Sequence, residues 1–128
     1  MIVVSAASIW QVVAQSAPAG AGPDIPFAAS FDVTDAPETF AITTLVLDFP
    51  PGAAVPLHKH PGRGAGIVLS GTLTSVTPEG HEQTLVAGDS WVEELGHEHF
   101  VRNASSEPVR LLFTLLVPVG EEIMIYPE

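Results

Sequence analysis

The stretch GAAVPLHKHPGRGAGIVLSGTL, residues 52–73, decides the fold of this chain. It carries two histidines, His58 and His60, on either side of Lys59. Successive side chains of a β-strand point to opposite faces, so both imidazoles are expected on one face and Lys59 on the other. Glycines and prolines on both sides of the pair indicate turns. Two neutral imidazoles side by side on a strand can supply part of a transition-metal site.

This stretch resembles the first conserved motif of the cupin superfamily. Gly52 is followed after five residues by His58 and His60, and Gly71 closes the motif. A second stretch, GDSWVEELGHEHFVRN, resembles the second cupin motif. The residues that fit it are Gly88, Gly96, His99 and Asn103, while Glu94 stands at the usual proline position. The resemblance covers roughly residues 41–119 and is specific for the fold, whereas the fold itself hosts many chemistries.

The resemblance implies an all-β fold, a double-stranded β-helix or jelly-roll barrel. It also implies that His99 lies opposite His58 and His60 across the barrel, so that the three histidines bind one divalent transition metal. Iron, zinc, nickel, cobalt and manganese all accept imidazole ligands. Protonation of the histidines at low pH is then expected to release the metal.

The glutamate of the first motif is missing, because its position in this chain is Gly64. We expect the glycine to leave a coordination position with room for water, substrate or dioxygen. The ligand set would then be neutral, which keeps the metal a strong Lewis acid. Cupin dioxygenases similar to the acetylacetone and cysteine dioxygenases work with three histidines. The alternative is a decayed site that binds metal weakly or not at all.

Glu93 is the expected catalytic residue. It lies six residues before His99 on a strand that should line the barrel, and a similar glutamate occurs in three-histidine cupins. Its role is open among a hydrogen-bond acceptor beside the metal, a general base and a replacement ligand. Trp91 should share its face and form part of the pocket wall. For His97 an exposed position at the rim is expected.

Several other polar residues near the motifs are expected to have ordinary roles. We expect Glu94 and His81 to lie in solvent and Asn103 to order a turn. Arg63 and Lys59 are expected near the mouth of the barrel.

The rest of the chain reads as roughly ten short strands joined by close turns, which favours a sandwich or barrel. Apolar and β-branched residues predict strands at 2–4, 9–13, 27–33, 41–49, 73–76, 83–86, 91–93, 99–103, 109–117 and 123–126. A helix at the N-terminus is the alternative, because Ile9, Val12 and Val13 also fit helical spacing. Residues 1–128 are expected to form a single domain, with 1–40 as strands and loops that pack on the barrel or on a dimer partner.

The composition excludes several classes of partner. Four Lys and Arg against 15 Asp and Glu give a net charge of −11, which disfavours nucleic acid. No apolar run reaches the ~20 residues of a membrane span, and no basic region precedes the apolar N-terminus. We therefore expect a cytoplasmic protein. A homodimer is expected, because the apolar segment that carries Trp10 needs to be covered. The chain has no cysteine, so thiolate metal sites are absent.

These observations predict a metal-dependent enzyme, an oxygenase, isomerase or lyase that acts on a small organic molecule. The metal would polarise a carbonyl or bind an enolate, and Glu93 would move a proton. The alternatives are a non-catalytic module that binds a small molecule or a metal, and a structural or storage protein with a stabilising metal. An open coordination position favours an enzyme over the structural role, because structural metal sites are usually closed.

Overall fold

The computed structural model describes residues 32–128, and residues Asp35–Glu128 form one compact unit. This unit contains eight strands: β1 (Phe40–Phe49), β2 (Ala54–His58), β3 (Gly64–Ser70), β4 (Thr72–Val76), β5 (Glu82–Val86), β6 (Ser90–Glu93), β7 (His99–Arg102) and β8 (Val109–Pro118). Within the described range no helix is long and apolar enough to cross a membrane.

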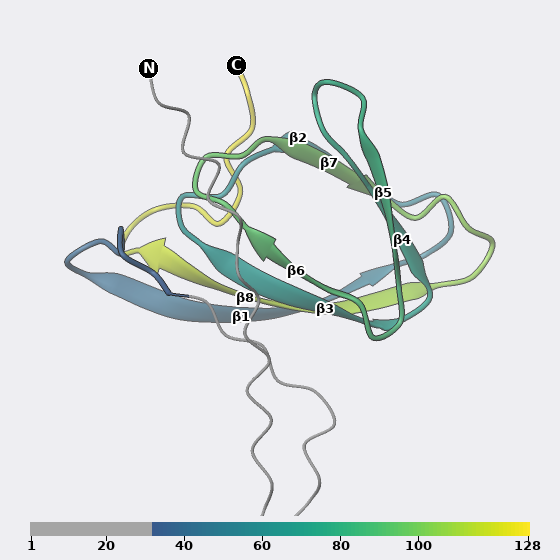
Figure 1. Ribbon diagram of the computed structural model, residues 1–128, viewed down its shortest axis with the longest axis horizontal. Coiled ribbons are helices and arrows are strands. Elements are labelled where there is room, and N and C mark those ends of the chain that lie inside the picture. The colour runs from purple at the N-terminus through teal and green to yellow at the C-terminus, as the bar shows by residue number, and fades with distance from the viewer. Residues whose placement is uncertain (1–31) are drawn as a thin grey trace, which may run out of the picture. The chain divides into compact units, whose positions relative to one another are not determined.

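The strands form two four-stranded antiparallel sheets. One has the order β1-β8-β3-β6 and the other the order β2-β7-β4-β5. Figure 1 shows the two sheets facing each other around a common interior. Consecutive strands lie in different sheets at every step along the chain except one. The exception is β4 and β5, which pair as a hairpin within one sheet. This arrangement is the double-stranded β-helix predicted from the two sequence motifs.

Strand β8 is the centre of the core. It pairs with β1 along ten residues, from Phe40 opposite Pro118 to Phe49 opposite Val109, and with β3 on its other side. Because both edges are paired and one face is covered by the second sheet, every second side chain is buried. The inward residues are at most 5% exposed: Val109, Leu111, Phe113, Leu115 and Val117. The strands predicted at 41–49 and 109–117 are therefore confirmed.

The strand predicted at 123–126 is wrong. In this segment only Ile125 pairs, through an isolated antiparallel bridge to Lys59. The N–H of each residue donates to the carbonyl of the other, at 3.0 and 2.9 Å. Pro61 and Gly62 bend the chain directly after His60, so no longer stretch is available for pairing. The expected strands and loops before residue 32 lie outside the described residues, and Asp32 and Val33 are not in a strand.

The remaining predicted strands are confirmed within one or two residues. The hairpin predicted at 73–76 and 83–86 is β4 and β5, the segment 91–93 is β6, and 99–103 is β7. Eight strands are thus present in the described residues where roughly ten were predicted for the whole chain.

Candidate metal centre

Three histidines from neighbouring strands form the candidate metal centre. His58 ends β2 and His99 begins β7, and these two residues are direct cross-strand partners. His60 follows after Lys59, so the alternation of the backbone returns it to the same inward side. All three are buried, with exposed fractions of 2%, 3% and 4% for His58, His60 and His99. The predicted grouping of these three residues is therefore present, but His99 lies on the strand paired with β2 in the same sheet and not across the barrel as expected.

The imidazole rings lie against one another. Their centroids are 4.3 Å apart for His58 and His99, 4.9 Å for His58 and His60, and 5.3 Å for His60 and His99. Each residue offers one ring nitrogen, and these nitrogens all lie within 4.8 Å of one another. Nitrogens that bind one metal at about 2.0–2.1 Å lie no more than about 4.2 Å apart, so at most a small movement of the side chains would bring these three to binding distance.

Backbone carbonyls fix the orientation of all three rings. Nδ1 of His58 lies 2.7 Å from the carbonyl oxygen of Pro56, and Nδ1 of His60 lies 2.8 Å from that of Ile123. Nδ1 of His99 lies 3.3 Å from the carbonyl oxygen of His97. A carbonyl can only accept, so each Nδ1 carries the proton and each Nε2 keeps its lone pair. This is the tautomer that metal-binding histidines need, and it supports the fit of a metal to these residues.

Burial also keeps the three imidazoles neutral. It lowers the pKa of His58 and of His60, and it lowers the pKa of His99 to about 4, with a further contribution from the neighbouring His58. Neutral imidazole is the metal-binding form, so these residues are in the required protonation state at neutral pH.

The sequence did not reveal the role of the segment around Ile123. Its carbonyl accepts from His60, although the two residues are 63 positions apart. The bridge between Lys59 and Ile125 holds this segment next to the two histidines. The β-like composition of 123–126 was a signal that the segment pairs, but a backbone acceptor has no signature in the side chains.

Glu93 lies beside the histidines but outside their group. Its Oε1 is 3.4 Å from Nε2 of His99 and accepts a hydrogen bond of 2.8 Å from the indole N–H of Trp91. The group of mutually close ligand atoms contains the three histidines alone among the described residues. Burial raises the pKa of Glu93 to about 7, opposed by the Trp91 hydrogen bond and reinforced by Glu94. Because His99 is neutral and its Nε2 carries no proton, this contact is a close approach of two polar atoms rather than an ion pair.

The space directly beside Gly64 is filled. A Cβ atom at Gly64 would lie 2.8 Å from the carbonyl oxygen of Thr114 and 2.9 Å from side-chain atoms of Leu115 and Phe113. Strand β8 therefore fills the space in which a side chain would start. Gly64 is the cross-strand partner of Glu93 on β6, so the inward carboxylate of this region comes from the neighbouring strand instead.

Gly66 leaves the space that the Trp91 side chain occupies. The two are cross-strand partners on β3 and β6, and a Cβ at Gly66 would lie only 2.2 Å from the indole ring. The glycine thus provides the hollow in which the indole lies flat against the backbone. The ring stacks near Phe113, at 6.1 Å between centroids, and its N–H faces Glu93. Trp91 forms the predicted pocket wall.

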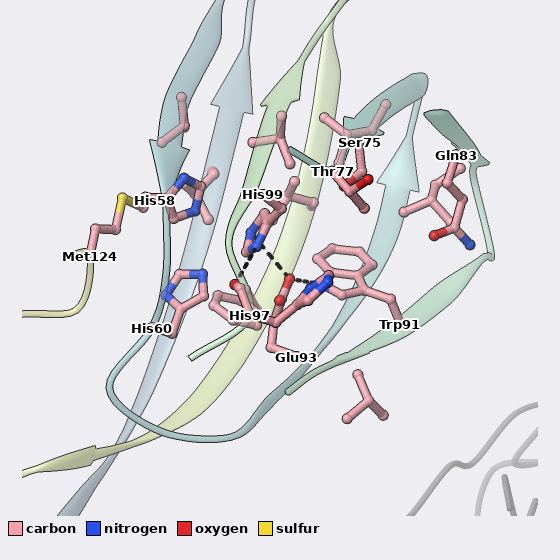
Figure 2. Close-up of a pocket in the computed structure, with 18 of the residues that line it drawn as sticks. His58, His60, Ser75, Thr77, Gln83, Trp91, Glu93, His97, His99 and Met124 are labelled. Atoms are coloured by element: carbon pink, nitrogen blue, oxygen red, sulfur yellow. Dashed lines mark hydrogen bonds and ion pairs between the residues drawn. The ribbon is translucent and has the colours of Figure 1, made fainter. Parts of the chain in front are cut away.

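A cavity of about 250 Å³ opens in front of the three histidines and Glu93. Its walls are largely apolar and come from both sheets, among them Phe49, Leu73, Leu85, Leu111 and Phe113. Figure 2 shows His58, His60 and Met124 on one side of the cavity and Ser75, Thr77 and Gln83 on the other. A volume of this size, below the usual range for drug-sized ligands, suits a compact molecule.

The other candidates have the expected minor roles. Asn103 orders a turn: its amide donates to the carbonyls of Phe49 and Glu107, and its oxygen accepts from Ser105. His97 and His81 are exposed at the rim of the cavity.

Glu94 was expected in solvent and Arg63 near the mouth of the barrel, but both are half-buried. They pair with each other, and Arg63 also donates to Asp35 at 2.9 Å. Arg63 is thereby engaged outside the cavity.

Comparison with known proteins identifies the family of this fold. The family model described as a cupin domain matches residues 45–115, which is more than half of the chain. None of the curated proteins compared with the chain matches it.

Solved structures are similar to the chain at low identity. An uncharacterised conserved protein with a double-stranded β-helix domain from Klebsiella pneumoniae is 24% identical, with a TM-score of 0.59, over 76% of this chain and 89% of that one. A cupin domain from Bordetella pertussis is 25% identical, with a TM-score of 0.53, over 64% and 86%. The polyketide cyclase RemF from Streptomyces resistomycificus is 17% identical, with a TM-score of 0.59, over 68% and 62%. With the motifs, the two facing sheets and the family match in agreement, the chain belongs to the cupin family.

Proposed function

We propose that this protein is a metal-dependent enzyme, an oxygenase, isomerase or lyase, that acts on a small organic molecule. One observation carries the proposal. Three buried histidines have their Nδ1 atoms tied to backbone carbonyls, which leaves three Nε2 lone pairs facing an apolar cavity with a carboxylate at its wall.

The residues that would hold the metal are His58, His60 and His99. Three neutral nitrogen ligands suit zinc, iron, nickel, cobalt or manganese and leave further coordination positions for a substrate oxygen. A metal bound there would supply Lewis acidity toward that oxygen. The position free for substrate is on the cavity side of the histidines, and not at Gly64, where β8 occupies the space.

Glu93 is the residue proposed to move a proton. Its carboxylate lines the cavity, lies within 3.4 Å of His99 Nε2 and is held in one orientation by the Trp91 N–H. A substrate bound in front of the histidines would place its acidic C–H or O–H within reach of this carboxylate. The apolar walls around it exclude bulk water, which protects the substrate during the transfer.

The test combines metal analysis with a screen for turnover of small ketones and aromatic acids, including oxygen uptake. Once a substrate is found, Glu93→Gln should keep one metal per chain and lose ~10²–10⁴ in rate, the usual contribution of a proton-transfer residue. Glu94→Gln is the matched control, because Glu94 is the neighbouring carboxylate and pairs with Arg63 outside the cavity. If Glu93→Gln loses the metal, Glu93 is a ligand. If it keeps both metal and rate, Glu93 does not move the proton. If the screen finds no turnover at all, a non-catalytic binding module is the better description.

A further inference from the structure

We propose that the pocket contains a second binding position, formed by Ser75 and Gln83, for a neutral hydrogen-bonding group at the far end of the ligand. The ligand class is a largely apolar molecule with a metal-binding oxygen group at one end and a hydroxyl, carbonyl or amide at the other. This inference rests on the proposed function, because the metal fixes the first end.

The inward face of the β4–β5 hairpin changes from apolar to polar toward the mouth of the cavity. Leu73 and Leu85 are cross-strand partners and are 1% and 5% exposed. Two positions further along, Ser75 faces Gln83 in the same register. Since alternate residues share a face, this polar pair continues the same inward surface, and both residues line the cavity.

The polar pair has unused hydrogen-bonding capacity. Within the described residues neither the Ser75 hydroxyl nor the Gln83 amide has a side-chain hydrogen bond or ion pair. Thr77, the next inward residue, differs because its hydroxyl accepts from the His81 N–H in the turn at 3.2 Å. Ser75 and Gln83 together offer a hydroxyl, an amide donor and an amide acceptor to a ligand. In Figure 2 they lie on the side of the pocket away from His58 and His60.

No lysine or arginine reaches the pocket. The whole sequence has four such residues, Lys59, Arg63, Arg102 and Arg110, and none of them lines the cavity. The three arginines are paired with carboxylates: Arg63 with Asp35 and Glu94, Arg102 with Glu82, and Arg110 with Asp48. Lys59 alternates with His58 and His60, and it therefore faces away from them.

The far end of the ligand must therefore be uncharged. Gln83 is exposed at the mouth of the cavity, so discrimination at this end comes from charge rather than from desolvation. A carboxylate or phosphate next to Ser75 and Gln83 would find no lysine or arginine, and the carboxylates of Glu82 and Glu93 line the same cavity. The net charge of −11 adds long-range repulsion. We therefore expect a negative charge only at the metal end, and dicarboxylates and sugar phosphates should bind more weakly than ligands with a neutral far end.

A matched series of aryl hydroxamates tests this inference on the zinc-loaded full-length protein. Benzohydroxamic acid supplies the oxygen chelate and an apolar ring. Its para-hydroxymethyl and para-carboxy derivatives add a neutral or an anionic far end. By isothermal titration calorimetry, the para-carboxy compound should bind about tenfold or more weakly than the para-hydroxymethyl compound, as expected for a charged group left without a partner.

Two lysine variants of β5 provide the decisive comparison. Gln83→Lys places a cation in the pocket and should tighten binding of the para-carboxy compound about tenfold, while the unsubstituted compound changes by less than about twofold. Thr84→Lys adds the same charge on the opposite face of the strand, one residue away, and should leave the order of the three compounds unchanged.

The inference is overturned if the native protein binds the para-carboxy and para-hydroxymethyl compounds equally well. It is also overturned if Gln83→Lys and Thr84→Lys have the same effect, because the gain would then come from net charge alone. If the unsubstituted hydroxamate does not bind the zinc-loaded protein, the metal-anchored ligand itself is wrong. In that case the proposed function fails as well. If the unsubstituted hydroxamate binds but the order of its derivatives is not the expected one, only this inference fails.

Discussion

The two sides of the candidate site are held in place by different means. On the histidine side, backbone carbonyls orient the rings, and two of these carbonyls, in Pro56 and His97, lie only two residues from the ring they bind. On the Glu93 side, the carboxylate is oriented by a side chain, Trp91, which itself needs the hollow at Gly66. The histidine side is thus set largely by local chain geometry, whereas the carboxylate side depends on the packing of two strands.

The largest expected effect is the loss of metal when the histidine side is removed. The double variant His58→Ala, His60→Ala removes two of three ligands, and metal per chain after dialysis should fall to nearly nothing by elemental analysis. His81→Ala, which removes an exposed histidine, should keep the full metal content. Full occupancy in the double variant would show that the metal is bound elsewhere.

The next effect tests the one distant support of the histidine side. Ile125→Pro removes the N–H that donates to the Lys59 carbonyl and should displace the segment whose Ile123 carbonyl orients His60. Loss of such a supporting hydrogen bond typically weakens metal binding by ~10–100-fold. Zinc affinity measured by competition with a chelating dye would show this, and Ile125→Val, which keeps the N–H, is the control. Equal affinities in both variants would mean that the ring needs no such support.

A third prediction breaks the carboxylate side while the histidines remain intact. Gly66→Ala places a methyl group on the Trp91 ring and should lower the free energy of unfolding by ~1–3 kcal/mol, the usual cost of overpacking. Urea denaturation measures it. Ala65→Ser on the same strand is the control, because its side chain points to the other face. If Gly66→Ala is as stable as the native protein, the indole can move at no cost and does not fix Glu93.

The smallest effect sharpens the comparison to a single hydrogen bond. In a double-mutant cycle of Trp91→Phe and Glu93→Met, the coupling free energy between the two sites should be about 0.5–1.5 kcal/mol. Phenylalanine keeps the ring next to Phe113, and methionine keeps the length of the side chain without an acceptor. Additive effects on the free energy of unfolding would show that the indole N–H does not hold the carboxylate.

The same contrast explains how much the sequence could predict. The inward direction of His58 and His60 follows from strand alternation, and the place of His99 follows from the motif resemblance, so both could be predicted. The strands β1 and β8 could be predicted from their apolar and β-branched residues.

Features that depend on side chains from distant strands could not be predicted. Gly64 was expected to leave open space, but Phe113 and Leu115 of β8 fill it, and no local pattern reports that contact. The carbonyl of Ile123 was missed, because a backbone acceptor leaves no trace in residue identity. The Ser75–Gln83 pair depends on the register of one hairpin, which alternation alone does not determine.

The separation between His60 and Ile123 has a consequence for biosynthesis. His60 leaves the ribosome 63 residues ahead of the carbonyl that orients it, and β1 must also wait for β8 before the sheet can close. Contacts at such separation form late in folding. An unfolded or nascent chain binds whichever metal has the highest affinity for free histidines, in the general order that favours copper over zinc and iron. A metal held by the closed barrel would instead be bound in the geometry of the three histidines, so we expect the compartment in which this chain completes folding to influence which metal is bound.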